Sequence, residues 1–363
     1  MICQGYIDEI IKIAYNKSNV LAEKGRMQVK NITMADIAKR TGYSVNTVSH
    51  ALNNKPDISE KTKKYIAETA KEMGYIANVS ASALRSGKSR SVAIIVGDIS
   101  NPHFSIIIKE MERRLRDFAY NAIIINTDEN EDLEHEAIVS AISKNVDGII
   151  LCPVQKTRNN IDFLNKIGVP YVLLGRRFEG TLSSYVICDD INGGFAAAEH
   201  LLIGNHKNIL FINAPLYISS ARDRLDGIKR AFRIYGAPLD CLLLAEISTV
   251  DGGDEILEIL KKNVSCTGII CFSDLIAMQV CHFLKQLGKQ VPKDVSVVGF
   301  DNIASKFYLP LMLTSVTFSK TKMSVKTVDT LINIIDGKIS SGQQHILPTK
   351  IEKRESTEIL RNV

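Results

Sequence analysis

The spacing of apolar positions divides this chain into a short helical part and a longer part of mixed strands and helices. Between residues 31 and 76 apolar side chains recur at helical spacing, as Val48, Ala51 and Leu52 do on one side of a short segment. From residue 91 onward, short apolar runs alternate with stretches long enough for helices. The pattern predicts a small all-α domain followed by an α/β region.

Helix-start signals refine the prediction for the first part. Thr33 and Asp36 form a capping box, Ser44 is a good N-cap for the second segment, and Ser59 opens a third that ends at Gly74. Two short helices across a glycine turn, with a third that buries their apolar faces, are typical of a helix-turn-helix domain. The alternative is a small helical bundle that binds no nucleic acid.

The outward face of the second helix favours the DNA-binding interpretation. This face carries short, uncharged side chains, most of which can form hydrogen bonds: Val45, Asn46, Ser49, His50 and Asn53. Such a face suits a groove lined with base edges. Residues 31–90 also contain ten basic and five acidic residues, whereas residues 91–363 carry a net charge of −2. A basic excess at one end suits phosphate contacts, although a solvated charged face has the same composition.

The second part predicts parallel sheets. Its apolar runs suggest about ten strands buried on both faces, which is too many for one sheet, so we expect two doubly wound lobes with a ligand cleft between them. The clearest of these runs are residues 92–96, 122–126, 148–152, 171–174, 209–212, 268–272 and 295–298.

Composition excludes several classes of protein. The chain of 363 residues is 45% hydrophobic and 23% charged and has no apolar run near the ~20 residues that span a bilayer, so we expect a protein without membrane spans. Its seven cysteines form no CxxC pair and its N-terminus is a poor signal peptide. We therefore expect a cytoplasmic protein with no metal site and no cofactor. It has no P-loop, GxSxG, GxGxxG or HExxH motif, so we expect no enzymatic activity.

Several dispersed motifs, found in order along the chain, resemble those of one known protein family. Residues 32–39, 43–49, 52–53, 58–62 and 74–78 resemble the DNA-binding headpiece of the lactose-repressor (LacI/GalR) family. The match continues through the segments 98–104, 147–150, 189–193, 220–227, 273–274, 298–302, 313–316 and 347–357. The resemblance implies a helix-turn-helix headpiece, a hinge helix and a two-lobed core like that of the periplasmic sugar-binding proteins.

The resemblance also implies which residues contact DNA. Leu84 matches the hinge leucine that enters the minor groove and kinks the duplex; its alternative role is an anchor against the core. The expected DNA-binding residues are Thr33, Ser44, Val45, Asn46, Thr47, Ser49, His50, Asn53, Ser59, Thr62, Tyr75, Asn78, Ala81 and Leu84.

Two residues lead the candidates for the effector site. Arg224 matches the arginine that grips the effector, and Asp301 matches the acid that accepts from its hydroxyls, although Asp301 would also suit the N-cap of a following helix. Arg176 and Arg177 slightly favour an anionic effector. The remaining effector candidates are His103, Phe104, Arg176, Cys188, Ser220, Ile247, Ser273 and Phe318, with Cys188 and Phe318 at positions where the family often has Phe and Gln.

We expect four segments: an N-terminal extension (1–30), the headpiece (31–76), the hinge (77–90) and the core (91–363). The N-lobe is expected at about 91–188 and 315–342, and the C-lobe at about 189–314 and 343–363. We also expect the native chain to begin at Met27; the alternative is a genuine N-terminal arm. Near the C-lobe, Asn205 stands where the family has glycine, and asparagine tolerates the left-handed turn expected there.

The functional hypothesis is a homodimeric transcription regulator, most simply a repressor, that binds a pseudo-palindromic operator in double-stranded DNA and answers to a small-molecule effector such as a sugar. One alternative is a global regulator controlled by a phosphorylated carrier protein. Another is a solute-binding protein, which would need a signal peptide and no headpiece.

Overall fold

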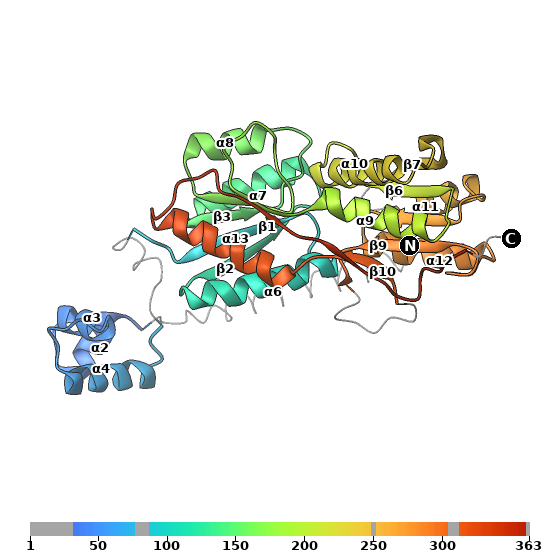
Figure 1. Ribbon diagram of the computed structural model, residues 1–363. Coiled ribbons are helices and arrows are strands. Elements are labelled where there is room, and N and C mark those ends of the chain that lie inside the picture. Colours follow the sequence, from blue (N-terminus) through green and yellow to red (C-terminus); the bar gives the residue numbers. More distant parts are fainter. Residues whose placement is uncertain (1–31, 77–86, 248–251, 304–311, 361–363) are drawn as a thin grey trace, which may run out of the picture. The chain divides into compact units, whose positions relative to one another are not determined.

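The computed structural model describes residues 32–76, 87–247, 252–303 and 312–360, and its contacts divide the chain near residue 82 into two compact units (Figure 1). The predicted N-terminal extension, the start at Met27 and the hinge positions Asn78, Ala81 and Leu84 lie outside the described residues.

The first unit is the three-helix headpiece, built from α2 (Met34–Thr41), α3 (Val45–Leu52) and α4 (Glu60–Glu72). All three predicted N-caps are confirmed; the Ser44 hydroxyl, for example, accepts the N–H of Thr47 at 3.1 Å. At the end of α4, Gly74 adopts a φ of +71°, which lets the N–H of Tyr75 reach the carbonyl of Ala70 at 2.9 Å.

The headpiece closes around a small apolar centre. Ile37, Val48 and Ile66, one from each helix, are fully buried. Burying each side chain contributes about 1.5–3 kcal/mol. Because these residues use the inward faces of α2, α3 and α4, the polar face of α3 stays outside.

The N-lobe of the core is a six-stranded sheet with the order β11-β5-β4-β3-β1-β2. Helices cover both of its faces, and the crossovers are parallel, as the alternating pattern predicts. The strands are β1 (Ser91–Val96), β2 (Asn121–Asn126), β3 (Gly148–Leu151), β4 (Tyr171–Leu174), β5 (Tyr185–Cys188) and β11 (Gln344–Leu347). The helices are α6 (Pro102–Asp117), α7 (Glu131–Ser143), α8 (Asn159–Ile167) and α13 (Lys320–Ile335).

The C-lobe is a second six-stranded sheet with the order β12-β10-β9-β8-β6-β7, in which only the β10–β12 pair is antiparallel. The strands are β6 (Ile209–Asn213), β7 (Leu242–Glu246), β8 (Gly268–Cys271), β9 (Ser296–Phe300), β10 (Thr314–Thr317) and β12 (Lys350–Glu352). The helices are α9 (Asp190–Ile203), α10 (Ser219–Ile234), α11 (Gly253–Lys262) and α12 (Asp274–Gln286), with a 3-10 turn at Leu239–Cys241.

Strand β1 shows why these runs are apolar throughout. Val92 and Ile94 belong to the core cluster that α6 and α13 share, whereas Ala93 and Ile95 belong to the cluster under α7 and α8. Figure 1 shows α13 and α8 on opposite sides of this sheet. Since successive side chains point to opposite faces, a strand covered on both sides must be apolar at every position.

Two sequence predictions need correction. Strand β2 is not buried on both faces, because it lies at the edge of its sheet, and Ile124 is 42% exposed. The lobe boundaries are also shifted: β10 pairs with β9 in the C-lobe, and β11 pairs with β5 in the N-lobe. The chain therefore returns to the N-lobe after residue 317 instead of at 315, and leaves it after 347 instead of 342. The sequence of a short strand does not reveal which of two sheets it joins.

Helices α9 and α10 pack closely in the C-lobe through glycines. A Cβ on Gly194 would lie 2.1 Å from the carbonyl oxygen of Arg224, and one on Gly227 would lie 1.9 Å from that of Ile191. This packing sets the position of α10, which supplies Arg224 to the site described below. At the other end of α9, Asn205 has a φ of +62°, which confirms the predicted left-handed turn.

None of the helices within the described residues has the length and apolarity needed to cross a bilayer. Across the same residues, no group of three or more His, Cys, Asp or Glu side chains is placed to hold a metal ion.

Candidate functional site

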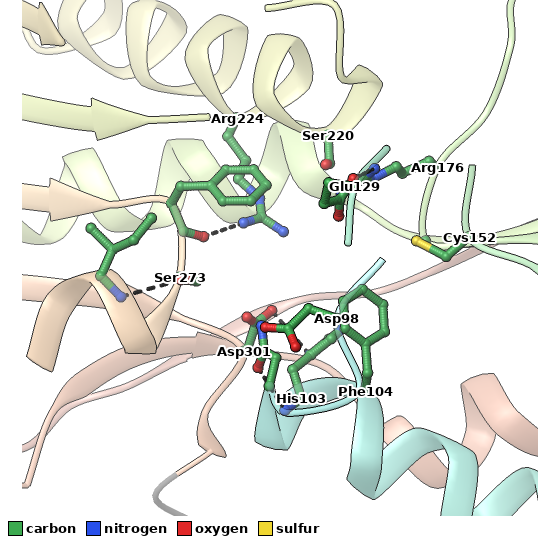
Figure 2. A pocket seen from close by; sticks show the side chains of 14 residues that line it. Asp98, His103, Phe104, Glu129, Cys152, Arg176, Ser220, Arg224, Ser273 and Asp301 are labelled. Carbon is green, nitrogen blue, oxygen red and sulfur yellow. Dashed lines mark hydrogen bonds and ion pairs between the residues drawn. The ribbon is translucent and has the colours of Figure 1, made fainter. Parts of the chain in front are cut away.

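A cavity of about 80 Å³ lies between the two lobes of the core (Figure 2). Its walls are formed largely by loops that follow parallel strands of both sheets, the place where open α/β sheets bind ligands. The lining residues are Asp98, Asn101, His103, Phe104, Glu129, Cys152, Gly175, Arg176, Ser220, Arg224, Phe272, Ser273, Ile276 and Asp301.

Arg224 enters the cavity from α10 and is held on several sides. Its Nε donates to Oδ1 of Asp190 at 2.8 Å, and its Nη1 donates to the carbonyl of Phe272. Its guanidinium carbon lies 3.4 Å from the ring centre of Phe300 and 4.4 Å from that of Phe272. Burial raises the pKa of Asp190 to about 6 even though Arg224 opposes the shift. Arg224 is therefore a rigid, stacked donor whose position depends on a buried carboxylate.

Arg176 forms the facing wall through a bidentate ion pair. Its Nη1 and Nη2 donate to the two carboxylate oxygens of Glu129 at 2.8 and 2.7 Å, and Nη1 also donates to the carbonyl of Pro153. Burial opposes its charge, but the Glu129 carboxylate outweighs that effect and raises the pKa of Arg176. Its neighbour Arg177 pairs with Asp223. Both arginines that favoured an anionic effector are thus already neutralised.

His103 and Asp301 face each other on a third side of the cavity. Nδ1 of His103 lies 3.2 Å from Oδ1 of Asp301 without the geometry of a hydrogen bond, and it has no hydrogen-bond partner among the described residues. Burial lowers the pKa of His103 to about 4, although Asp301 opposes the shift. The ring, which packs edge-on against Phe104 and Phe318, is therefore neutral at pH 7.

Asp301 is held by a buried network. Its backbone has a φ of +93°, a conformation that side chains other than glycine adopt only when the surroundings impose it. The Asp274 carboxylate accepts the N–H of Ile303 at 2.8 Å and the hydroxyl of Ser315 at 2.7 Å, and the same hydroxyl accepts the N–H of Asn302. Burial raises the pKa of Asp274 to about 7. Any helix for Asp301 to cap would fall on residues 304–311, outside the described residues.

A separate set of polar contacts joins the lobes beside the cavity. Oε1 of Gln155, in the N-lobe, accepts from the backbone N–H of Ser219 at 2.9 Å and from its hydroxyl at 3.2 Å. The N–H of Arg177 donates to the Ser219 hydroxyl at 3.0 Å, and its guanidinium donates to both carboxylate oxygens of Asp223. We call Gln155, Arg177, Ser219 and Asp223 the inter-lobe latch.

The structure brings most of the predicted effector residues together. His103, Phe104, Arg176, Ser220, Arg224, Ser273 and Asp301 all line the cavity. Three do not. Ile247 follows β7, an edge strand of the C-lobe sheet; it is 2% exposed and packs into the apolar cluster under α11 and α12. Cys188 and Phe318 are buried behind the wall, where Phe318 touches the His103 ring.

Sequence reasoning missed half of the wall. Asp98 and Asn101 lie within a segment that carried the family resemblance, so they were within reach of the sequence analysis. Glu129 follows an edge strand at a positive φ of 53°, and no motif marks it. The missed lining residues are Asp98, Asn101, Glu129, Cys152, Gly175, Phe272 and Ile276.

In the headpiece, the outer face of α3 is presented as predicted. Val45 is 49% exposed, Asn46 and Asn53 are exposed, and Ser49 and His50 are half-buried. The other predicted DNA-contacting residues of this unit lie at the starts of helices. Thr33, Ser44 and Ser59 are exposed N-caps. Thr47 and Thr62 donate their backbone N–H groups to the hydroxyls of Ser44 and Ser59. Tyr75 packs against the headpiece centre.

Sequence profiles match both units. The profile of bacterial regulatory proteins, lacI family, covers residues 33–78, and that of the periplasmic binding proteins and sugar binding domain of LacI family covers residues 89–359. The chain belongs to the LacI family. It is therefore a DNA-binding regulator with a core of the sugar-binding type.

Relatives of this LacI-family chain are transcriptional regulators. The HTH-type transcriptional regulator DegA of Bacillus subtilis (strain 168) is 30% identical over 330 residues, which are 90% of this chain and 98% of that protein. Catabolite control protein A of Priestia megaterium is 30% identical over 331 residues, which are 90% and 99% of the two chains.

Solved structures of the family share the fold. The lac repressor dimer bound to operator has a TM-score of 0.80 at 21% identity and covers 91% of this chain and 100% of its own. A LacI family regulator from Enterococcus faecium with bound ribose has a TM-score of 0.67 at 27% identity and covers 75% of this chain and 100% of its own.

Proposed function

We propose that this LacI-family protein is a homodimeric repressor of transcription that binds a pseudo-palindromic operator. A small neutral metabolite in the inter-lobe cleft controls its affinity for that operator. The observation that carries the proposal is the cavity between the lobes, in which Arg224 and Asp301 face the same space beside a latch that joins the lobes. A ligand in that space touches both lobes and so discriminates between their arrangements.

The charges of the cleft favour a hydroxyl-rich effector without a formal charge. Arg176 and Arg224 are each paired with a carboxylate, so neither brings an uncompensated positive charge. The Asp301 carboxylate faces the neutral His103 ring and offers acceptors for the hydroxyl groups of a ligand. A sugar or related polyol supplies donors for Asp301 and acceptors for the guanidinium groups, whereas a phosphate would meet Asp98, Glu129 and Asp301 in the same cavity.

The cavity size supports a coupling between binding and lobe movement. Its volume of about 80 Å³ is below the roughly 300–1,000 Å³ of pockets that bury drug-sized ligands. A sugar must therefore displace wall side chains or separate the lobes. A ligand shifts such an equilibrium only by its differential affinity for the two arrangements.

On the DNA side, the proposal assigns base contacts to the exposed face of α3 and phosphate contacts to the basic residues around α4. Lys61 and Lys64 are exposed there, whereas Lys63 is paired with Glu60 at 2.7 Å. Two headpieces, one from each protomer, match two half-sites of a pseudo-palindrome. The hinge positions Asn78, Ala81 and Leu84 keep their proposed minor-groove role.

The test uses the full chain. A random duplex library is selected against the purified protein at moderate salt, and the molar mass is measured by light scattering. We expect a pseudo-palindromic motif and a dimer; a monomer, or no enriched motif, contradicts the proposal. A thermal-shift screen then compares neutral sugars with their phosphates and with small acids. We expect a neutral sugar to raise the melting temperature and weaken binding to the selected duplex.

The same screen addresses the alternative of a regulator controlled by a phosphorylated carrier protein. That alternative has support from the similarity to catabolite control protein A. If no small molecule raises the melting temperature but a phosphorylated protein changes the affinity for the selected duplex, the alternative replaces the effector part of the proposal.

A further inference from the structure

A short hydrogen bond holds the one titratable side chain on the outer face of α3. Nδ1 of His50 lies 2.6 Å from Oδ2 of Asp57, seven residues later in the chain. The side chain of His50 is 38% exposed and that of Asp57 is 54% exposed. An exposed ion pair of this kind adds little stability. Its main consequence is the orientation and the tautomer that it imposes on the imidazole.

The local fold places Asp57 beside the helix it follows. Helix α3 ends at Leu52, and Asn54 adopts a φ of +53°. This left-handed residue lets the N–H of Lys55 reach the carbonyl of His50 at 2.9 Å and the N–H of Asn54 reach that of Ala51 at 3.1 Å. The chain therefore turns back at Asn54, which brings Asp57 to the imidazole.

The bond fixes which ring nitrogen carries the proton. A carboxylate only accepts hydrogen bonds, so Nδ1 of His50 is the protonated nitrogen. Nε2 has no partner among the described residues. In the neutral ring Nε2 is an acceptor, and in the charged ring it is a donor.

Those two states suit different bases. In the major groove, cytosine presents only an amino group that donates, whereas guanine presents only O6 and N7, which accept. Adenine presents one group of each kind, and thymine presents O4, which accepts. An Nε2 acceptor therefore matches cytosine and adenine, whereas an Nε2–H donor excludes cytosine and matches guanine, thymine and adenine.

We propose that Asp57 is a positioning residue that turns Nε2 of His50 toward one base pair of each half-site, so that His50 prefers cytosine to guanine when neutral and guanine to cytosine when protonated. This inference rests on the proposed function, in which the outer face of α3 enters the major groove. It assigns a specificity role to a residue outside α3 that itself contacts no base.

The charges around the pair leave Asp57 ionised across the pH range of interest. The hydrogen bond from His50 lowers the pKa of Asp57, and the charges of His50 and Lys55 add to that effect. From the helices packed on α3, Asp36 of α2 bonds to Thr33, and Glu60 of α4 pairs with Lys63. Within the pair, Asp57 is therefore the fixed charge that orients the imidazole.

The test is a selection of random duplexes by the full-length protein at pH 6 and pH 8, followed by titration of single-base variants of the selected duplex. For the wild type we expect one position of each half-site to prefer guanine to cytosine at pH 6 and cytosine to guanine at pH 8, with about tenfold discrimination in each case. His50→Gln should give the same preference at both pH values, because glutamine does not titrate.

Two substitutions at Asp57 separate charge from position. Asp57→Asn keeps an acceptor for Nδ1–H and should retain the pH 8 preference while it weakens the guanine preference at pH 6. Asp57→Ala should relax that base pair at both pH values and leave the others unchanged. Glu68→Gln, an exposed change on α4, is the matched control and should behave as the wild type.

The outcomes separate the two proposals. If the wild type enriches a motif but shows the same preference between cytosine and guanine at both pH values, or if Asp57→Ala changes no single base pair, the inference is wrong and the proposed function stands. If the wild type enriches no motif although circular dichroism shows a folded protein, the proposed function is wrong and the inference falls with it.

Discussion

Nε of Arg224 lies 2.8 Å from Oδ1 of Asp190, and the two residues are 6% and 2% exposed. The residue proposed to grip the effector is thus one half of a buried ion pair between α10 and the start of α9. The orientation of Arg224 in the cleft and the stability of the C-lobe therefore depend on the same contact. A single substitution of Arg224 changes both, and a second substitution at Asp190 separates them.

Arg224→Ala should therefore damage folding as well as effector binding. Removing one partner of a buried pair leaves an uncompensated charge, so we expect the free energy of unfolding to fall by about 3–5 kcal/mol. The double variant Arg224→Ala with Asp190→Asn removes the orphaned charge and should recover part of this loss without recovering the effector response. Urea unfolding and a thermal-shift titration measure the two effects. Equal stability of the single and double variants would contradict the pairing argument.

The inter-lobe latch should set the balance between lobe arrangements. Arg177→Ala removes the bond to Asp223, and hydrogen bonds to charged groups contribute about 1.5–3 kcal/mol. A sugar that separates the lobes must break the latch, so its apparent affinity for Arg177→Ala should rise about tenfold, and the radius of gyration from small-angle scattering should rise. Arg158→Ala, which removes a more exposed guanidinium 3.9 Å from Asp162, should change neither quantity. An unchanged effector affinity in Arg177→Ala would remove the latch from the mechanism.

His103 should make the core lose stability in acid. Burial lowers its folded-state pKa to about 4, below the ordinary value of 6.5, so the unfolded chain binds more protons between these values. The stability that His103 contributes is present above pH 6.5 and is lost as the pH falls toward 4, by about 3 kcal/mol at most.

The effect of His103 is measured as the difference in unfolding free energy between the wild type and a His103 variant. Asp190 and Asp274 have raised pKa values and act in the opposite direction, since their contribution is lost as the pH rises. His103→Gln removes only the titration of this histidine, so the wild type should lose stability relative to His103→Gln between pH 6.5 and pH 4 in urea unfolding. Parallel curves for the two proteins would show that His103 does not titrate as described.

The glycine contact between α9 and α10 should tolerate no side chain. A Cβ on Gly227 meets the carbonyl of Ile191 at 1.9 Å, which is backbone and cannot move aside. Gly227→Ala should cost about 1–3 kcal/mol or more by overpacking and should shift Arg224 in the cleft. Gly253→Ala is the control, because nothing lies within 4 Å of its Cβ position and the helix gains from alanine. Differential scanning calorimetry checks both; a stable Gly227→Ala variant would contradict the packing.

The sequence by itself determined the local structure of this protein. Thr33, Ser44 and Ser59 start the headpiece helices because a hydroxyl placed one residue before a helix satisfies a free N–H whatever surrounds it. Asn205 forms its left-handed turn for a similarly local reason. Strands β1, β3, β4, β6, β8 and β9 were visible because a strand covered on both faces must be apolar throughout, and the dispersed motifs carried the family.

Only the tertiary structure decided which side chains share the cleft and which are already occupied. Glu129 and Asp190 are far from Arg176 and Arg224 in the chain, so no spacing reveals that they neutralise these arginines. Ile247 was expected in the effector site but packs under α11 and α12, and the residues of β10 and β11 were assigned to the wrong lobes, because the sequence of a short strand carries no mark of the sheet it joins. The packing of the whole lobe fixes which distant elements pair with one another. Spacing and composition along a single sequence do not reveal this pairing.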